Sequence, residues 1–435
     1  MTNYFHKAKQ LTDTLHANLD VPVVWGGIQP TVEPDLCLDY ADIVCIGEGE
    51  QALADLAACI QGGQSYAHIP NLGYKTEQGQ VVVNPPRPLI QDLDQLPFPD
   101  FGPEGHYLLH RGRVVPLTPN LLRTYLMDAS ATGQPVYPLL ATRGCPHRCS
   151  YCANDAYADL YRSWRKVRRR SNASLIAEIQ AFRAQFPFVG EVAFLDDVFV
   201  AAPTETIEAF ARLYKASVGL PFYCIVSPLT INEPKLKALL DAGLIRVSMG
   251  IQTGSPQLQE LYHRRIDNEV VLKAAHLFNR HQAQMLSPVY DIITDNPYAT
   301  PEDQLDTLRL LNQLPRPYKM LMFSLVFYPG TALYEKALAE GLIEDVNAEV
   351  YSRNYFKLQP TYYNLALYGF HRQFPPGLLR LMSHKYVFRL LSASVLRPLW
   401  RLGNWLLMGV RVWYNKLRLK RFRQYSADID QEGHR

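Results

Sequence analysis

Short apolar runs alternate with amphipathic segments through the middle of the chain. From about residue 136, six runs predict buried strands: VYPLLAT, EVAFLD, FYCIV, IRVSMGI, QMLSPVYDII and KMLMFSLVF. Between them lie five segments with helical apolar spacing: SLIAEIQAFRAQF, PTETIEAFARLYKA, EPKLKALLDAG, EVVLKAAHLFN and PEDQLDTLRLLNQL. Mostly apolar strands joined by helices are typical of parallel sheets. The pattern predicts a partial or full β/α barrel, whose chemistry lies at the carboxyl ends of its strands.

Residues 1–62 show a similar design on a smaller scale. The apolar run Val21–Trp25 is followed by a glycine pair, and the apolar part of Ala41–Glu50 leads into GEGE and a helical segment, QALADLAACI. Glycines between short strands and helices are typical of a doubly wound, Rossmann-like sheet. Because only two strands are convincing, we expect further strands upstream, or a partner, to complete this sheet.

Two other regions flank the barrel. Residues 63–135 are rich in Pro and Gly and predict a linker with hairpin-like pieces such as YKTEQGQVVV. The region 344–435 predicts a basic, mainly helical end. Residues 351–427 hold fourteen of the 44 Lys and Arg of the chain and none of its 41 Asp and Glu.

The basic side chains of this end are interleaved with Leu, Trp and Phe, which predicts an amphipathic surface. We expect peripheral contact with an anionic membrane through residues 380–425. A solvated basic face packed on the barrel, a nucleic-acid patch and a surface for an anionic protein are the alternatives. Of these we do not expect nucleic acid.

No signal peptide precedes the first strand, and no uncharged apolar run reaches the roughly 20 residues of a membrane-spanning helix. We therefore expect a cytoplasmic protein, peripheral on the inner membrane face if the basic end binds lipid. In a reducing compartment, clustered cysteines indicate metal binding or catalysis rather than disulfides.

Three cysteines, Cys145, Cys149 and Cys152, crowd into C-x3-C-x2-C directly after the first barrel strand. A structural zinc site takes four ligands, so zinc would need His147 or a distant cysteine as the fourth. An iron–sulfur cluster usually takes four cysteines as well. Three ligands are sufficient when one iron stays open for a substrate or cofactor. Arg143 and Arg148 are expected to offset the charge of the thiolates.

The stretch RGCPHRCSYCAN, with the aromatic Tyr151 before its last cysteine, resembles the radical S-adenosylmethionine (SAM) superfamily. The resemblance implies that the three cysteines hold a [4Fe–4S] cluster. It also implies that SAM binds the open iron and is cleaved reductively to a 5′-deoxyadenosyl radical. This resemblance covers roughly residues 136–343.

Polar residues near later strand ends fit the same family. The segments FLDDVF, CIVSPLTI, VSMGIQTGS and YDIITDNP resemble its SAM-contacting motifs. Together with the cysteine motif they imply cofactor contacts from Asp196, Asp197, Ser227, Gln252, Asp291 and Tyr151. The family often has Arg at the third position and Glu at the fourth, so Ser227 and Gln252 depart from it. An acidic helix cap is the alternative for either of the first two residues.

The N-terminal part resembles the end of a cobalamin-binding Rossmann-like domain, with GGIQPT followed by GEGE. The resemblance implies cobalamin contacts from Gly26, Gly27, Gly47, Glu48 and Gly49. The family's domain normally begins further upstream, and the pattern D-x-H-x-x-G is absent here. Cobalamin binding by an incomplete domain of residues 1–62 is therefore an open expectation.

The resulting fold prediction is a radical SAM barrel of TIM type over residues 136–343, after an incomplete cobalamin-binding domain. The resemblance implies a radical SAM enzyme, with methylation or rearrangement at an unactivated carbon as the expected reaction. The alternatives are a cobalamin-independent hydrogen-abstracting enzyme and a non-catalytic iron–sulfur or zinc protein. Expected partners are an electron donor such as a flavodoxin or ferredoxin and a small, hydrophobic substrate.

Overall fold

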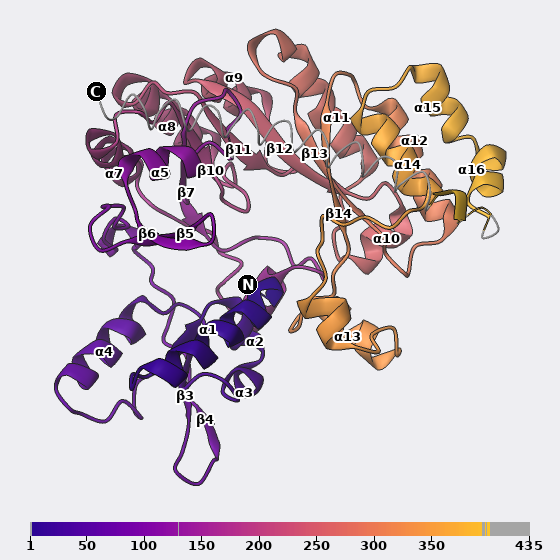
Figure 1. Ribbon diagram of the computed structural model, residues 1–435. Coiled ribbons are helices and arrows are strands. Elements are labelled where there is room, and N and C mark those ends of the chain that lie inside the picture. Colours follow the sequence, from indigo (N-terminus) through magenta and orange to yellow (C-terminus); the bar gives the residue numbers. More distant parts are fainter. Residues whose placement is uncertain (1, 129, 394–395, 397, 401–435) are drawn as a thin grey trace.

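The structure, a computed structural model, describes residues 2–128, 130–393, 396 and 398–400. Its centre is a six-stranded parallel sheet whose strands follow chain order (Figure 1). The strands are β7 (Val136–Leu139), β10 (Glu191–Phe194), β11 (Phe222–Val226), β12 (Leu244–Gln252), β13 (Val289–Thr294) and β14 (Lys319–Ser324). Within the described residues no ladder joins β7 to β14. All six predicted strands are confirmed. In the described residues they make up a partial barrel.

Five predicted helices cover one face of this sheet (Figure 1). They are α7 (Asn172–Gln185), α8 (Thr204–Ser217), α9 (Glu233–Asp241), α11 (Asn268–Arg280) and α12 (Pro301–Gln313). The residues at the start of α12 explain why the helix begins there. Thr300 and Asp303 form a capping box, and Pro301 occupies the first turn, where its missing N–H costs nothing.

The opposite, concave face of the sheet is unusual for a parallel sheet because apolar side chains on it are exposed. Phe194 and Met320 point to the helices and are buried in the main core. Their neighbours Leu195 and Leu321 point the other way and are 43% and 45% exposed. Parallel sheets normally bury both faces. These positions of the concave face are therefore open to solvent.

The N-terminal region forms a second sheet of order β1-β2-β3-β4 in its own lobe (Figure 1). Strands β1 (Val24–Gly26) and β2 (Ile43–Cys45) are parallel, as predicted, and β3 (Leu72–Lys75) and β4 (Val81–Val83) are antiparallel to their neighbours. The hairpin expected within the linker therefore extends this sheet. The helices of the lobe are η1 (Thr2–Tyr4), α1 (Phe5–Asn18), α2 (Ile28–Val32), α3 (Pro34–Cys37) and α4 (Glu50–Gln61).

Shorter elements complete the fold. The connection to the barrel holds η2 (Leu93–Gln95), the hairpin of β5 (Tyr107–His110) and β6 (Arg113–Pro116), and α5 (Pro119–Tyr125). Around the barrel lie β8 (Thr142–Arg143), α6 (Ala153–Leu160), β9 (Arg168–Arg169), α10 (Pro256–Leu261), η3 (Gln282–Gln284), α13 (Ala332–Ala339) and η4 (Asn347–Tyr351).

The end of the described chain is helical, as expected. Helices α14 (Tyr362–His371), α15 (Pro376–Met382) and α16 (Lys385–Leu391) contact α12 beside the barrel (Figure 1). Residues 401–425 of the predicted membrane-contacting segment lie outside the described residues. Among the described helices, none combines the length and the hydropathy needed to cross a bilayer.

Candidate functional site

The three clustered cysteines lie on one loop at the carboxyl end of the first barrel strand. This ligand loop, residues 144–152, connects β8 to α6. The Cys152 amide donates to the Cys149 carbonyl (2.9 Å), and the Ser150 amide donates to the Tyr262 carbonyl across the barrel (3.0 Å). Cys145 and Cys149 are buried and Cys152 is half-buried. The three thiols therefore lie on one loop and are largely shielded from solvent.

The ligand loop starts at a position that only glycine fits. Gly144 has φ +93°, and a Cβ there would lie 2.4 Å from the Trp164 carbonyl oxygen. Both the left-handed backbone and the close approach exclude a side chain. The segment around Trp164 thus packs directly on the ligand loop.

The surroundings of the thiols favour a shared cation. Burial first, and then Asp197 and the neighbouring thiols, raise the pKa of Cys145 to about 12 and that of Cys152 to about 11. Clustered thiolates without a cation are therefore unfavourable, and a bound metal group relieves this repulsion. Among the described residues, no group of three or more His, Cys, Asp and Glu side chains is placed to hold a metal ion. Thiols are the ligands that iron–sulfur clusters take, so the chemistry of this donor set fits such a cluster.

Two side chains already donate to the sulfur atoms. Arg264 Nη1 lies 3.6 Å from Cys149 Sγ, and Asn154 Nδ2 lies 3.7 Å from Cys152 Sγ. Arg264 also donates to the Gly250 carbonyl (2.8 Å), while its buried Nε has no hydrogen-bond partner. Sequence reasoning missed Arg264 because nothing in the segment HRRI marks it as close to the cysteines.

The arginines of the cysteine motif have other partners than expected. Arg143 pairs with Glu48 (3.2 Å) and Glu50 (2.5 Å), and Arg148 pairs with Asp155 (2.7 Å) and Asp159 (2.5 Å). Both guanidinium groups are thus occupied by carboxylates. Arg264, rather than either of these, contacts a ligand-loop thiol.

The adjacent acids after β10 differ sharply in their surroundings. Asp196 is 1% exposed and accepts hydrogen bonds from the Ala141 amide and the Thr142 hydroxyl. These bonds hold the end of β7 to β10 and leave Asp196 little capacity for a ligand. Asp197 is exposed and accepts from Asn154 Nδ2 (3.0 Å). Of the two acids, Asp197 therefore lies closer to the ligand loop.

The other predicted barrel residues lie at or below the strand ends. Ser227 is buried and accepts a weak bond from the Leu229 amide (3.4 Å), which suits a turn. Gln252 ends β12 at φ +69° beside a bulge in the ladder, a strained conformation that clusters at functional sites. Burial raises the pKa of Asp291 to about 6, with Ser248 as its hydrogen-bond donor (3.4 Å). Tyr151 packs edge-on against Tyr262 (ring centroids 5.0 Å apart).

The glycines of the N-terminal domain divide into two groups. A Cβ on Gly27 would have nothing within 4 Å, and one on Gly26 would only touch Cys45 at 3.9 Å. This edge of β1 is open and fits the close approach of a flat ligand. A Cβ on Gly47 would lie 2.0 Å from the Tyr161 hydroxyl oxygen, and one on Gly49 would lie 3.0 Å from Cys45 Sγ. Protein atoms, not open space, surround this second pair.

Glu48 links the two lobes. Its carboxylate accepts from Arg168 at 2.7 and 3.0 Å, from Arg143 at 3.2 Å and from the Ile90 amide at 3.0 Å. Burial opposes its ionisation, but the hydrogen bonds from Arg168 and Ile90 outweigh this and lower its pKa. The side chains of Glu48 and Arg168 are only 9% and 4% exposed. Glu48 thus joins the GEGE turn to the strands that flank the ligand loop.

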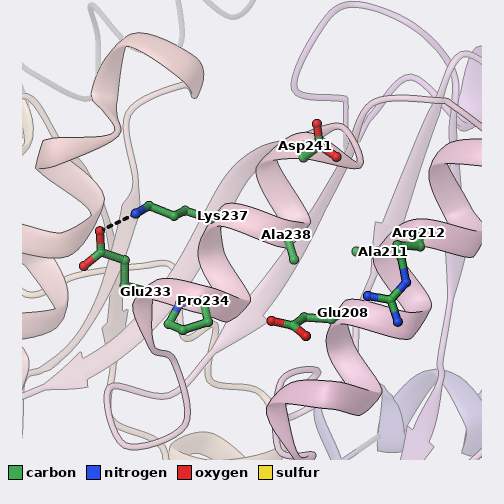
Figure 2. Close-up of a pocket in the computed structure, with 8 residues that line it drawn as sticks. All are labelled: Glu208, Ala211, Arg212, Glu233, Pro234, Lys237, Ala238 and Asp241. Atoms are coloured by element: carbon green, nitrogen blue, oxygen red, sulfur yellow. Dashed lines mark ion pairs between the residues drawn. The ribbon is translucent and has the colours of Figure 1, made fainter.

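A groove on the outside of the barrel is not part of this site. About 650 Å³ in volume, it lies between α8 and α9 (Figure 2). Glu233 and Lys237 pair with each other on its wall (2.9 Å). The groove lies on the helical face, away from the ligand loop.

Comparison with known proteins agrees with this arrangement. Residues 139–311 match the radical SAM superfamily, and residues 1–57 match the B12 binding domain. An uncharacterized methyltransferase, PH0819 of Pyrococcus horikoshii, is 27% identical over 339 residues, which are 77% of this chain and 67% of the relative. The anaerobic magnesium-protoporphyrin IX monomethyl ester cyclase of Rubrivivax gelatinosus is 26% identical over 64% of this chain and 47% of its own length.

Solved structures share the fold. The radical SAM methyltransferase TsrM from Kitasatospora setae, with tryptophan substrate and a SAM analogue bound, superposes with a TM-score of 0.60 at 20% identity, covering 78% of this chain and 61% of TsrM. The cobalamin-dependent radical SAM enzyme OxsB, with aqua-cobalamin bound, gives a TM-score of 0.57 at 17% identity over 78% of this chain and 46% of its own. The chain is thus shorter than each of these proteins.

The open barrel with its cysteine loop defines a radical SAM domain, and the N-terminal lobe is a B12-binding domain. Residues 139–311 thus belong to the radical SAM superfamily and are preceded by a B12-binding domain over residues 1–57. Membership implies a [4Fe–4S] cluster and SAM as cofactors, and the B12-binding domain implies cobalamin. The fold and the cofactor classes expected from the sequence are confirmed.

Proposed function

We propose that this chain is a cobalamin-dependent radical SAM enzyme that transfers a methyl group to an unactivated carbon of a small hydrophobic molecule. The observation that supports this most directly is the ligand loop, whose three shielded thiols lie at the barrel mouth beside the B12-binding lobe. When bound, the cluster and SAM supply one-electron cleavage to a carbon radical, and cobalamin supplies a methyl carrier. Ring formation or another rearrangement is the second outcome of the same cofactors.

In this proposal Cys145, Cys149 and Cys152 hold the cluster, and Arg264 balances the negative charge that the thiolates bring. Arg264 suits this role because its guanidinium is always charged and already contacts Cys149. Asp197, Gln252 and Asp291 are the proposed SAM contacts. Cobalamin is proposed to approach the open edge at Gly26 and Gly27.

The concave face supports an apolar substrate. Leu140 is 55% exposed there, and Leu195 and Leu321 continue the same face. Such side chains gain about 25 cal/mol for each Å² of apolar surface that a ligand covers. An apolar ligand that lines this face also excludes water from the radical.

The first test is SAM cleavage. The chain is purified anaerobically, its cluster is reconstituted, SAM and dithionite are added, and 5′-deoxyadenosine is measured. Wild type is expected to form it, and Cys149→Ala is expected to form none and to hold less iron. Cys59→Ala, a buried thiol of the N-terminal lobe, is the matched control and should keep both. No product from a fully loaded wild type would contradict the proposal.

The cobalamin-independent alternative is tested separately. Cobalamin retained in a 1:1 ratio after gel filtration, together with S-adenosylhomocysteine formation, would support methyl transfer. 5′-Deoxyadenosine formation by protein without cobalamin, at an undiminished rate and with no S-adenosylhomocysteine, would favour hydrogen abstraction alone.

We also propose peripheral membrane contact through residues 380–425. In the described part of that segment, Leu381 and Leu390 are 55% and 68% exposed beside Arg380 and Arg389. Exposed apolar and basic side chains together suit an anionic lipid surface. Flotation with phosphatidylglycerol vesicles should be lost when 380–425 is deleted and should be absent with phosphatidylcholine alone. Undiminished flotation of the deletion variant would contradict this proposal.

A further inference from the structure

The segment that follows α6 places exposed cations on the outer side of the ligand loop. Arg162, Arg165 and Lys166 are all exposed, within the sequence RSWRK. Among the described residues, none of the three has an ion-pair partner. This basic surface, defined by these three side chains, has no role in the site described above.

The basic surface touches the ligand loop directly. Nε and Nη2 of Arg165 both donate to the Pro146 carbonyl at 3.3 Å, and Pro146 follows the first cysteine. No other protein layer separates Arg165 from the loop at this contact.

The segment is held rigidly in this place. Trp164 is 8% exposed, stacks on Tyr157 (ring centroids 4.6 Å apart) and donates to Asn154 Oδ1 (2.8 Å). Asn154 in turn donates to Cys152 Sγ. The basic surface and the cysteines therefore belong to one packed unit.

Neighbouring acids do not neutralise this surface. The nearest exposed acid on α6, Asp159, pairs with Arg148, which also pairs with the buried Asp155. Farther along the segment, Arg168 is neutralised by Glu48 inside the protein. The three exposed cations thus face solvent as a local positive field, which steers acidic partners.

We propose that this basic surface docks an acidic one-electron carrier protein, of the flavodoxin class, that reduces the protein. This inference rests on the proposed function, which consumes one electron for each SAM cleaved. The carrier's reduced flavin loses one electron, and the cluster proposed for the ligand loop beneath Arg165 would accept it over a short path. Electron transfer falls steeply with distance, so a carrier gains most by docking at this face.

The test compares two reductants on the loaded, full-length chain. Arg162→Glu/Arg165→Glu/Lys166→Glu is expected to form 5′-deoxyadenosine about tenfold more slowly with reduced flavodoxin at low salt. With dithionite the same variant should stay within about twofold of wild type, since a small reductant needs no docking. Calorimetric titration of flavodoxin into the cluster-free chain should show the same loss of binding.

Two further variants separate charge from folding. Arg162→Glu/Lys166→Glu keeps the Arg165–Pro146 contact and should still lose flavodoxin-driven activity. Arg212→Glu/Lys215→Glu/Lys237→Glu, on the exposed sides of α8 and α9, makes the charge change of the triple variant elsewhere and should not lose this activity. Equal flavodoxin-driven rates and equal binding in all variants would overturn the docking surface. No product with dithionite in wild type would instead refute the proposed function, and this inference with it.

Discussion

Glu48→Gln should destabilise the contact between the lobes far more than its neighbour Glu50→Gln. Both carboxylates pair with Arg143, but Glu48 also neutralises Arg168, whose side chain is 4% exposed. Removing one partner of a buried pair leaves an uncompensated charge and costs about 3–5 kcal/mol. Glu50 is 39% exposed, and losing a surface pair costs about 1 kcal/mol or less.

The assay is urea unfolding of the cluster-free chain, followed by tryptophan fluorescence. Trp164 reports on this contact because the Arg168 guanidinium lies 5.6 Å from its ring centre. We expect the transition that Trp164 reports to shift to clearly lower urea in Glu48→Gln and hardly at all in Glu50→Gln. Equal shifts would refute the reasoning, because they would show that burial of the Glu48–Arg168 pair has no energetic weight.

The same pair gives a pH dependence with a definite sign. The pKa of Glu48 is lowered in the folded protein from an ordinary value of 4.5. Its contribution to stability is therefore complete above about pH 4.5 and is lost as pH falls through the folded pKa. Acid unfolding of Glu48→Gln should lack this component, which a pH titration of the unfolding midpoint measures.

Three other predictions concern the cofactors. Gly47→Ala should lower the unfolding midpoint, because the new methyl group would clash with Tyr161. In Gly27→Ala the new methyl group points into open space but strains the backbone. This variant should mainly reduce the amount of bound cobalamin, measured by absorbance. Asp197→Asn should weaken SAM binding, measured by calorimetry, and leave the melting temperature unchanged. Asp196→Asn should lower the melting temperature. The reverse pattern would contradict both assignments. Arg264→Gln should make the cluster harder to reduce, seen as a more negative midpoint in an EPR titration, because it removes a cation from Cys149.

The barrel could be predicted from the sequence because strand and helix periodicity are local properties. Even the position of the ligand loop followed, since Cys145 comes directly after an apolar run. The extent of the N-terminal sheet was not predictable in this way. The strand Leu72–Lys75 pairs with Ile43–Cys45, although the α4 helix lies between them in the sequence. The spacing of residues along the chain does not indicate such a pairing.

The glycines of the N-terminal lobe are a second feature whose contacts the sequence alone does not predict. A glycine pattern can mean that a ligand approaches the backbone or that protein atoms do, and the letters are identical. Gly27 borders open space, while Gly47 is filled by Tyr161, which lies over one hundred residues later. The sequence therefore predicted one set of glycines in contact with cobalamin. In the structure Gly27 borders open space, whereas Gly47 packs against protein atoms.

The arginines around the ligand loop extend this argument to charge. The sequence shows many cations near three cysteines, and charge balance alone assigns any of them to the thiolates. Burial and partners sort them: Arg143 holds the lobes together, Arg264 contacts the sulfur, and Arg165 faces solvent. A paired cation lends little field to the thiolates, and a solvated one is screened within about 10 Å at moderate salt. Of these three described arginines, the half-buried Arg264 is the one placed to tune the proposed cluster, and the exposed Arg165 belongs to the surface proposed to attract a partner.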